Sequence, residues 1–291
     1  MAIYSRNGQQ VNTPFNQTGE EISSAFDVSG EQVFAKITSL KVMTYNVGTW
    51  YVGRHDNVPA ASDADYYALQ KGIIQQNNPD ILFLEEYCKQ FSKTGRTAIS
   101  ILQECGYTYI HEQGGDDPQA SNANGRCIAS KFPISNYVAN TFNDGGGMYY
   151  DYCSITVNGE TINLVITHLH WQDRTKRASE MATIMTKLSD FNRFIFAGDF
   201  NSTNCYDETG LDYPILIEPL LDAGYNVANC SDFGFIITYS DEPDDSWTAV
   251  LDNIVTPGNM PIISAYRDET KFNDGLNDHI DHVPFIAIVE L

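Results

Sequence analysis

Hydrophobic residues fall in short runs from Leu40 to the C-terminus, and segments of mixed polar and apolar positions separate these runs. Apolar runs of strand length that alternate with amphipathic segments are typical of α/β or α+β proteins, in which helices cover the faces of a sheet. The pattern therefore predicts a layered α/β domain over residues 39–291. Its expected strands are residues 40–45, 80–84, 126–130, 149–157, 161–169, 193–197, 248–255 and 283–291.

Three of the intervening segments have the periodicity of amphipathic helices, namely residues 65–76, 95–105 and 173–188. Their apolar positions recur every three or four residues, so each helix would bury one stripe against a sheet. Gly106 follows the second segment, where a glycine commonly ends a helix, and Asp173 opens the third as an N-cap. The third segment has the clearest pattern, and we assign its methionine-containing stripe to the core.

Two local patterns indicate hairpins. Asn158-Gly159 lies between two expected strands, and both residues tolerate the positive φ of a type I′ turn, so these strands should be antiparallel. Nearer the N-terminus, residues 4–11 and 26–33 share an aromatic residue, a glycine turn and a Gln-Val pair. This similarity indicates a duplicated hairpin-like unit, with chance as the alternative. We interpret residues 1–38 as an appendage of the domain.

The 291 residues are 42% hydrophobic and 19% charged, which is the composition of a globular protein with a substantial core. The 6 cysteines are scattered without a CxxC pair, which favours reduced, structural cysteines over a zinc site or a disulfide scaffold. No apolar run approaches the roughly 20 residues that span a bilayer. The first residues also lack the segments of a signal peptide. We therefore expect neither anchor nor signal peptide, which leaves the compartment open, export included.

The formal net charge is −21, from 38 acidic and 17 basic residues. Such a charge opposes unselective binding to nucleic acid, because Lys and Arg must neutralise the phosphates. It does not exclude a nuclease, since some of the carboxylates can be metal ligands. Nucleic acid is therefore a disfavoured but open partner.

Polar side chains stand where several apolar runs end. Asn46, Glu85-Glu86, His168 and Asp199 each follow such a run, and ligands of open α/β sheets bind outside the carboxyl ends of strands. The segment 278–282 instead precedes the last run, and an antiparallel strand would bring its beginning to the same edge. The pattern therefore predicts one polar cluster at one edge of the domain.

This set of residues suits the hydrolysis of a phosphate ester. Carboxylates and an amide oxygen bind a hard cation such as Mg²⁺, the cation neutralises charge on the phosphoryl oxygens, and a histidine takes a proton from the attacking water. Mn²⁺ and Ca²⁺ are alternatives to Mg²⁺. Zinc fits poorly, because the chain has neither an HExxH motif nor paired cysteines.

Seven motifs follow one another from Leu40 to the C-terminus: Thr44-Tyr45-Asn46-Val47, Asp80 to Glu86, Asn124-Gly125-Arg126 with Ser130 to Ile134, Thr167-His168-Leu169, Gly198-Asp199-Phe200-Asn201, Leu251-Asp252-Asn253-Ile254 and Asp281-His282-Val283-Pro284. In content and order they resemble the endonuclease/exonuclease/phosphatase superfamily, which includes pancreatic-type deoxyribonucleases, abasic-site endonucleases, sphingomyelinases and inositol-phosphate phosphatases. The resemblance implies a four-layer α/β/β/α sandwich of two mixed sheets with outer helices, and a metal-dependent phosphoesterase site at one edge.

The resemblance also implies roles for individual residues. A metal ion would be bound chiefly by Glu86, with Asn46 and Asp281 assisting. His282 would be the general base, oriented by Asp252. The remaining roles are contacts to the scissile phosphate from His168 and Asn201, positioning of the nucleophile or assistance to the leaving oxygen by Asp199, and either a phosphate contact or a surface charge for Arg126.

Two assignments have a neighbouring competitor. Glu85 competes with Glu86, and the family's Gln-Glu pair at this point favours the second acid. Asp278-His279 competes with Asp281-His282, and the family's Asp-His-x-Pro motif favours the later pair. Ile280 departs from that motif, because the family usually has a small hydroxyl residue there.

The sequence supports three classes of function. The leading hypothesis is a nuclease or related phosphodiesterase. The alternative is a phosphatase or sphingomyelinase-like phosphodiesterase that acts on a small or lipid phosphate. The third is a non-catalytic binding module on the same fold. In each case residues 1–38 are a candidate attachment to a tethering partner.

Overall fold

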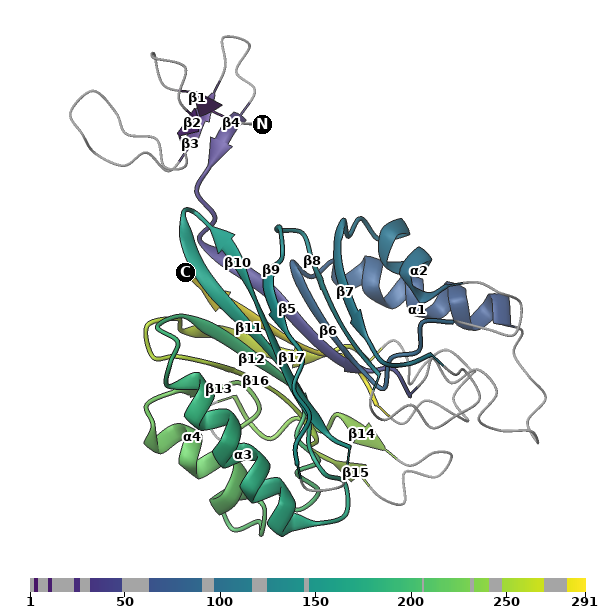
Figure 1. Cartoon of the computed structure of the whole chain (residues 1–291), viewed down its shortest axis with the longest axis vertical. Helices are drawn as coiled ribbons and strands as arrows, with labels where there is room; N and C mark the ends of the chain where they lie inside the picture. Colours follow the sequence, from purple (N-terminus) through teal and green to yellow (C-terminus); the bar gives the residue numbers. More distant parts are fainter. Residues whose placement is uncertain are drawn as a thin grey trace.

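The computed structural model describes residues 32–48, 63–90, 97–116, 125–143, 147–205, 207–230, 233–240, 248–269 and 282–291, with short strands at 3–4, 10–11 and 24–26. Two six-stranded mixed sheets stack face to face (Figure 1). The first sheet has the order β17-β18-β5-β6-β8-β7 and the second β13-β16-β12-β11-β10-β9.

The strands of the first sheet are β5 (Ser39–Asn46), β6 (Ile81–Glu85), β7 (Tyr109–Gln113), β8 (Arg126–Ser130), β17 (Ile262–Arg267) and β18 (Phe285–Glu290). Those of the second are β9 (Ser135–Val138), β10 (Tyr149–Val157), β11 (Glu160–His168), β12 (Phe194–Asp199), β13 (Asn226–Val227) and β16 (Asp252–Thr256). Each sheet contains one parallel pair, β5 with β6 and β11 with β12, among antiparallel neighbours.

Helices cover the outer faces of both sheets (Figure 1). The first sheet packs against α1 (Asp63–Asn77) and α2 (Ala98–Glu104), and the second against α3 (Arg174–Leu188), α4 (Glu218–Asp222) and the π-helical turn η2 (Tyr213–Ile217). This arrangement confirms the predicted four-layer α/β/β/α sandwich. Among the described residues no helix is both long and apolar enough to cross a membrane.

Strand β6 shows why the central strands are continuous apolar runs. Ile81 and Phe83 lie in the core between the two sheets, whereas Leu82 and Leu84 pack under α1 and α2. A strand that is covered on both faces buries every side chain, so its sequence does not alternate. Glu85 is the last residue of this buried strand and is itself completely buried.

The residues predicted to form a turn or to begin and end helices have the expected conformations. Asn158 and Gly159 have φ values of 52° and 84°, and the turn joins β10 to β11 in antiparallel register. Asp173 caps α3 by accepting the backbone N–H groups of Thr175 and Lys176 at 2.9 and 3.2 Å. Gly106 follows α2 with a φ of 92°.

The prediction of one continuous strand at residues 248–255 is wrong. It is split into β15 (Thr248–Ala249), which pairs with β14 (Tyr239–Ser240), and β16, which begins at Asp252. Thr238 Oγ1 accepts the N–H groups of Leu251 and Asp252 at 3.1 and 3.0 Å, so these two residues are held by a side chain at the break. The hydrophobic pattern also did not predict the edge strands β7, β9 and β17, because few of their side chains are buried.

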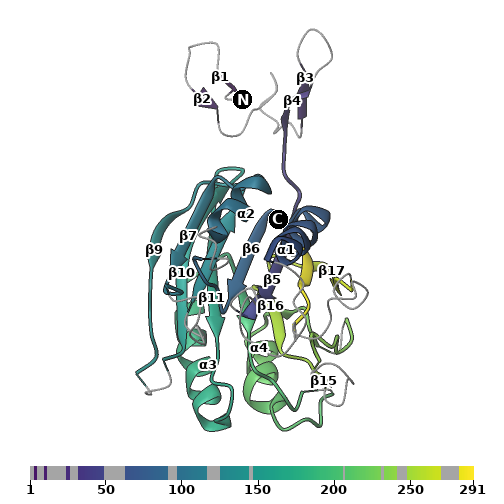
Figure 2. The same cartoon turned by 90° about the vertical axis from the view of Figure 1, so that its right-hand side faces the viewer.

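The segment before residue 36 contributes two short antiparallel pairs, β1 (Ile3–Tyr4) with β2 (Gln10–Val11) and β3 (Ser24–Phe26) with β4 (Gln32–Ala35). Both pairs lie outside the two main sheets (Figures 1 and 2). Asn158 binds the backbone at the junction, because its Oδ1 accepts from Ile37 N at 3.2 Å and its Nδ2 donates to Ile37 O at 2.6 Å. The junction therefore lies at the end of β11 opposite His168.

Candidate active site

The polar residues at the strand ends lie at one end of the sandwich and come from both sheets. Asn46 ends β5 and pairs in register with Glu85 of β6. His168 and Asp199 end β11 and β12 and pair with each other. Asp199 also pairs with Asp252, the first residue of the antiparallel β16. The register of the strands thus brings these side chains to one edge.

Asp199 is the centre of this cluster and is almost completely buried. Its Oδ2 accepts a hydrogen bond from Asn46 Nδ2 at 3.0 Å, and it lies 3.4 Å from His168 Nε2 and 3.6 Å from His282 Nε2. Its Oδ1 accepts the backbone N–H of Asn201 at 2.8 Å. One carboxylate therefore contacts residues from both sheets.

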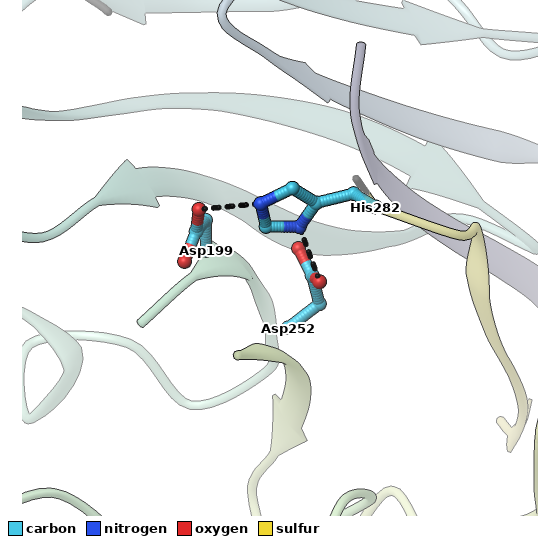
Figure 3. Close-up of side chains that lie close together, drawn as sticks. All are labelled: Asp199, Asp252 and His282. Atoms are coloured by element: carbon cyan, nitrogen blue, oxygen red, sulfur yellow. Dashed lines mark hydrogen bonds and ion pairs between the residues drawn. The ribbon is translucent and has the colours of Figure 1, made fainter. Parts of the chain in front are cut away.

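His282 lies between two carboxylates (Figure 3). Its Nδ1 is 2.9 Å from Asp252 Oδ2, and its Nε2 faces Asp199. A carboxylate on Nδ1 favours the tautomer with the proton on that nitrogen, which leaves Nε2 as the proton acceptor of the neutral ring. Burial raises the pKa of the Asp252 carboxyl, and the charge and hydrogen bond of His282 oppose that rise.

The backbone around Asp199 requires glycine before it. Gly198 has a φ of 147°, and a Cβ at this position would overlap the carbonyl oxygen of Thr167 on the neighbouring strand β11. Asn201 adopts a φ of 50°, which asparagine tolerates better than most residues, and its Nδ2 donates to Leu169 O at 2.8 Å. The Gly-Asp-Phe-Asn motif therefore holds Asp199 close to His168.

The two consecutive glutamates have different surroundings. Glu86 has a φ of 47°, is partly exposed, and its Oε1 lies 3.4 Å from Asn46 Nδ2. Glu85 is completely buried, and its Oε1 accepts from Thr44 Oγ1 at 2.9 Å. Burial raises the pKa of Glu85 well above its usual range, and the charges of Asp252 and Asp199 add to that rise. A partly exposed carboxylate beside Asn46 suits a metal ligand better, which favours Glu86.

Arg126 lies in a buried ion pair. Its Nε and Nη2 donate to the two oxygens of Asp151 at 2.7 and 2.9 Å, and its guanidinium lies 4.3 Å from the centre of the Tyr149 ring. These contacts join β8 of the first sheet to β10 of the second, so they give Arg126 a structural role. A phosphate contact by Arg126 stays a prediction. Asp281 and the competing pair Asp278-His279 lie outside the described residues.

Two neighbours of His282 and Asp252 were not predicted from the sequence. The ring of Tyr239 packs edge-on against the His282 ring with their centres 5.1 Å apart, and the two residues form a backbone bridge. Thr238 Oγ1 accepts the backbone N–H of Asp252 at 3.0 Å. The short apolar run before the acidic segment 241–245 could have indicated these two residues. Assigning that run to a strand would have placed it opposite residues 248–249.

The donor atoms of the cluster fit a divalent cation. Asp199, Asp252 and His282 each offer one atom, and these atoms lie within 4.8 Å of one another. Asn46 and Glu86 add an amide and a carboxylate next to Asp199. Oxygen-rich sets of this kind bind hard cations such as Mg²⁺ or Mn²⁺.

The sequence of the chain also matches a family whose members are generally hydrolytic phosphoesterases. Residues 43–271 match the model of the Endonuclease/Exonuclease/phosphatase family, so the chain belongs to that family. The resemblance inferred from the motifs is thus confirmed. No curated protein matches the chain in sequence.

Solved structures with low sequence identity share the fold. TDP2 from Caenorhabditis elegans is 16% identical with a TM-score of 0.61, over 87% of this chain and 75% of that one. TDP2 from D. rerio, complexed with a single-strand DNA product, is 15% identical with a TM-score of 0.64, over 88% and 100%. An endonuclease/exonuclease/phosphatase family protein from Bacteroides thetaiotaomicron is 15% identical with a TM-score of 0.62, over 87% and 97%.

Proposed function

We propose that this protein is a divalent-metal-dependent phosphodiesterase, in which His282 and Asp252 act as a general-base pair on the attacking water. The observation that carries the proposal is the position of the His282 ring, 2.9 Å from Asp252 at Nδ1 and 3.6 Å from Asp199 at Nε2. A histidine with an oriented tautomer and an accepting Nε2 can remove a proton from water near neutral pH.

Glu86 and Asn46 are the proposed metal ligands, together with Asp281. Mg²⁺ is the expected ion, with Mn²⁺ and Ca²⁺ as alternatives. When bound, such an ion neutralises the charge that develops on the phosphoryl oxygens. Glu86 suits this role because it is partly accessible and adjacent to Asn46, whereas Glu85 is enclosed and bonded to Thr44.

The other polar residues have proposed roles around the phosphate. Asp199 positions the water, since its Oδ2 lies near both His282 and His168. His168 donates to a phosphoryl oxygen through Nε2. Asn201 has two hydrogens on Nδ2 and gives one of them to Leu169 O, so the second is directed to the phosphate.

For the substrate, we propose a phosphodiester of a single-stranded or short nucleic acid. The zebrafish TDP2 structure of the same fold holds a single-strand DNA product. The net charge of −21 favours substrates that present few phosphates, because a long duplex would need many cationic contacts. That charge also favours the alternative, a phosphatase or sphingomyelinase-like enzyme acting on a small phosphate ester.

A substrate panel tests this proposal. The full chain is assayed with DNA, RNA, bis(p-nitrophenyl) phosphate, a phosphomonoester and sphingomyelin, in the presence of Mg²⁺, Mn²⁺ or Ca²⁺ and then with excess chelator. We expect metal-dependent cleavage of a phosphodiester, and loss of that activity in Asp199→Ala. His111→Ala is the matched control, because His111 lies on β7 away from the cluster. Equal rates with and without chelator, or in Asp199→Ala and the unsubstituted protein, contradict the proposal.

Residues 1–38 are proposed to tether the enzyme to a larger assembly. Asn158 holds the junction at Ile37, and this turn lies at the opposite end of β11 from His168. A partner bound there would leave the catalytic edge accessible. Deletion of residues 1–38 should change oligomeric state or partner binding without lowering kcat, and identical behaviour of both forms in light scattering and pull-down contradicts the tethering role.

A further inference from the structure

The exposed large hydrophobic side chains of the described residues fall into two groups. Tyr109, Val138, Ile263 and Tyr266 lie on the edge strands β7, β9 and β17. Trp171 and Leu211, each 61% exposed, instead lie on loops that follow β11 and β12. These two strands carry His168 and Asp199, so the most exposed aromatic residue of the described chain stands beside the candidate active site.

The backbone at Trp171 is held in place from both sides. Arg177, which is buried, donates to Trp171 O at 3.3 Å and to His170 O at 3.1 Å. The Nδ1 of His170 accepts the N–H groups of Gln172 and Asp173 at 3.3 and 3.0 Å. His170 therefore has a structural role, and the indole is presented to solvent from an ordered loop.

The loop that carries Leu211 is joined to the same arginine. Arg177 Nη2 donates to Asp212 Oδ1 at 3.0 Å, and Asp212 Oδ2 accepts Asn204 N at 3.0 Å. Arg174 donates to Leu211 O. Asp212 is completely buried, so the loops after β11 and β12 form one connected unit around it.

Trp171 is close enough to the reaction centre to contact a substrate. It lies three residues beyond His168, a separation of at most about 11 Å in extended chain. The start of α3 and the ends of β11 and β12 lie at the same end of the sandwich (Figure 1). A group that flanks the scissile phosphate is therefore within reach of the indole.

We propose that Trp171 stacks on a nucleobase next to the scissile phosphate, and so makes the enzyme selective for unpaired nucleotides. This inference rests on the proposed phosphodiesterase function. An indole offers a wide flat surface, and stacking of bases on aromatic side chains is strong and tolerant of sequence. With a net charge of −21, the protein gains affinity from stacking that it cannot gain by tracking phosphates. Bases in a duplex are already stacked, so single strands are preferred.

The test is steady-state kinetics of the full chain with Mg²⁺ on two single-stranded pentamers. One is a thymidine pentamer, and the other has the same backbone with abasic tetrahydrofuran units. We expect Trp171→Ala to raise KM for the thymidine pentamer about tenfold, in the range for loss of one base stack, with kcat nearly unchanged. The abasic pentamer should show no change, and Trp171→Phe should retain most of the affinity.

Ile263→Ala is the control, because this side chain is 56% exposed on β17 and should leave both KM values unchanged. An equal rise of KM on both pentamers, or no rise on either, overturns the stacking role. Hydrolysis of bis(p-nitrophenyl) phosphate without cleavage of either pentamer overturns the inference and the nucleic-acid substrate, and leaves the proposed phosphodiesterase chemistry standing. If no phosphate ester is hydrolysed, the proposed function fails and the inference fails with it.

Discussion

Two buried pairs, each with one carboxylate, join the two sheets in the described part of the chain, and they differ in how completely the carboxylate oxygens are hydrogen-bonded. In the first, Arg126 of β8 meets Asp151 of β10 through two hydrogen bonds. Asp151 also accepts from the hydroxyl of Tyr137 and from the backbone N of Asn140. Both of its oxygens are thus shared between two donors, which is what a purely structural carboxylate requires.

The second pair, His282 with Asp252, is less complete. Asp252 Oδ1 has no hydrogen-bond partner among the described residues, and His282 Nε2 lies 3.6 Å from Asp199, beyond a normal hydrogen bond. A buried carboxylate that keeps an unpaired oxygen costs stability, and such costs concentrate at sites with chemical roles. Both pairs are buried, so burial does not distinguish them, whereas the incomplete bonding of Asp252 marks the pair that we propose as catalytic.

Among the changes that leave the His282 ring and Asp199 in place, substitution of the orienting carboxylate should have the largest effect. Asp252→Asn keeps the size of the side chain but allows the other tautomer of His282, in which Nε2 carries the proton. We expect kcat to fall by about 10²-fold or more, the usual contribution of a general base. Kinetics on the preferred phosphodiester measure it, with circular dichroism to verify the fold. An unchanged kcat would remove Asp252 from the mechanism.

The structural pair should respond in stability instead of rate. Asp151→Ala leaves Arg126 buried without its partner, which typically costs about 3–5 kcal/mol of unfolding free energy. Urea denaturation measures this loss, and kcat of the folded enzyme should change little. The double variant Arg126→Met/Asp151→Leu should recover stability. Its KM decides the open role of Arg126, because an increase specific to KM would assign a phosphate contact.

The glycine before Asp199 gives a smaller effect that touches both properties. Gly198→Ala forces a side chain into a backbone conformation with φ of 147° and against Thr167 O. We expect a loss of about 1–3 kcal/mol in unfolding free energy, together with a reduced kcat as β12 shifts from β11. Gly72→Ala in α1 is the matched control, since an added Cβ there meets no atom within 4 Å apart from its chain neighbours and the nearby backbone of its own helix. Equal stability of the two variants would contradict the close approach.

The burial of an uncharged group, the Cys153 thiol, should have the smallest effect on stability. Burial raises the pKa of the Cys153 thiol to about 12, whereas an unfolded thiol titrates near 8.5. Between these values the unfolded state loses its proton first, so stability falls as the pH rises, and below about 8.5 this contribution is fully present. Urea midpoints at pH 8 and pH 10 should fall less in Cys153→Ala than in the unsubstituted protein. Equal changes of the urea midpoint in the two proteins would mean that the Cys153 thiol is exposed to solvent.

Much of the candidate site could be predicted because it depends on strand ends. Asn46, His168 and Asp199 each follow an apolar run; strand register brings His168 beside Asp199, and the stacking of the two sheets adds Asn46. The partner of Arg126 could not be predicted, since Asp151 is chosen by how the two sheets stack and not by any spacing in the sequence. The break before Asp252 was missed because it depends on hydrogen bonds that Leu251 N and Asp252 N donate to Thr238, which lies more than ten residues earlier in the sequence.

The edge strands illustrate the same limit for the fold. Strand β7 has no buried side chain and β9 is mostly exposed, so neither forms the apolar run that marked the central strands. Their place is fixed by hydrogen bonds to β8 and β10, which form only once those strands are in the sheet. The hydrophobic pattern predicted a layered α/β domain and the family resemblance implied its four layers, whereas neither predicted the sheet edges.

One comparison of rates shows whether His282 is the base of a metal-dependent phosphodiesterase. Hydrolysis of bis(p-nitrophenyl) phosphate with Mg²⁺ is measured across pH 5 to 9 for the unsubstituted protein and for His282→Ala. We expect a rate that rises with pH as the histidine loses its proton, and a loss of about 10²- to 10⁴-fold in the variant. Equal rates and equal pH profiles for the two proteins would contradict it.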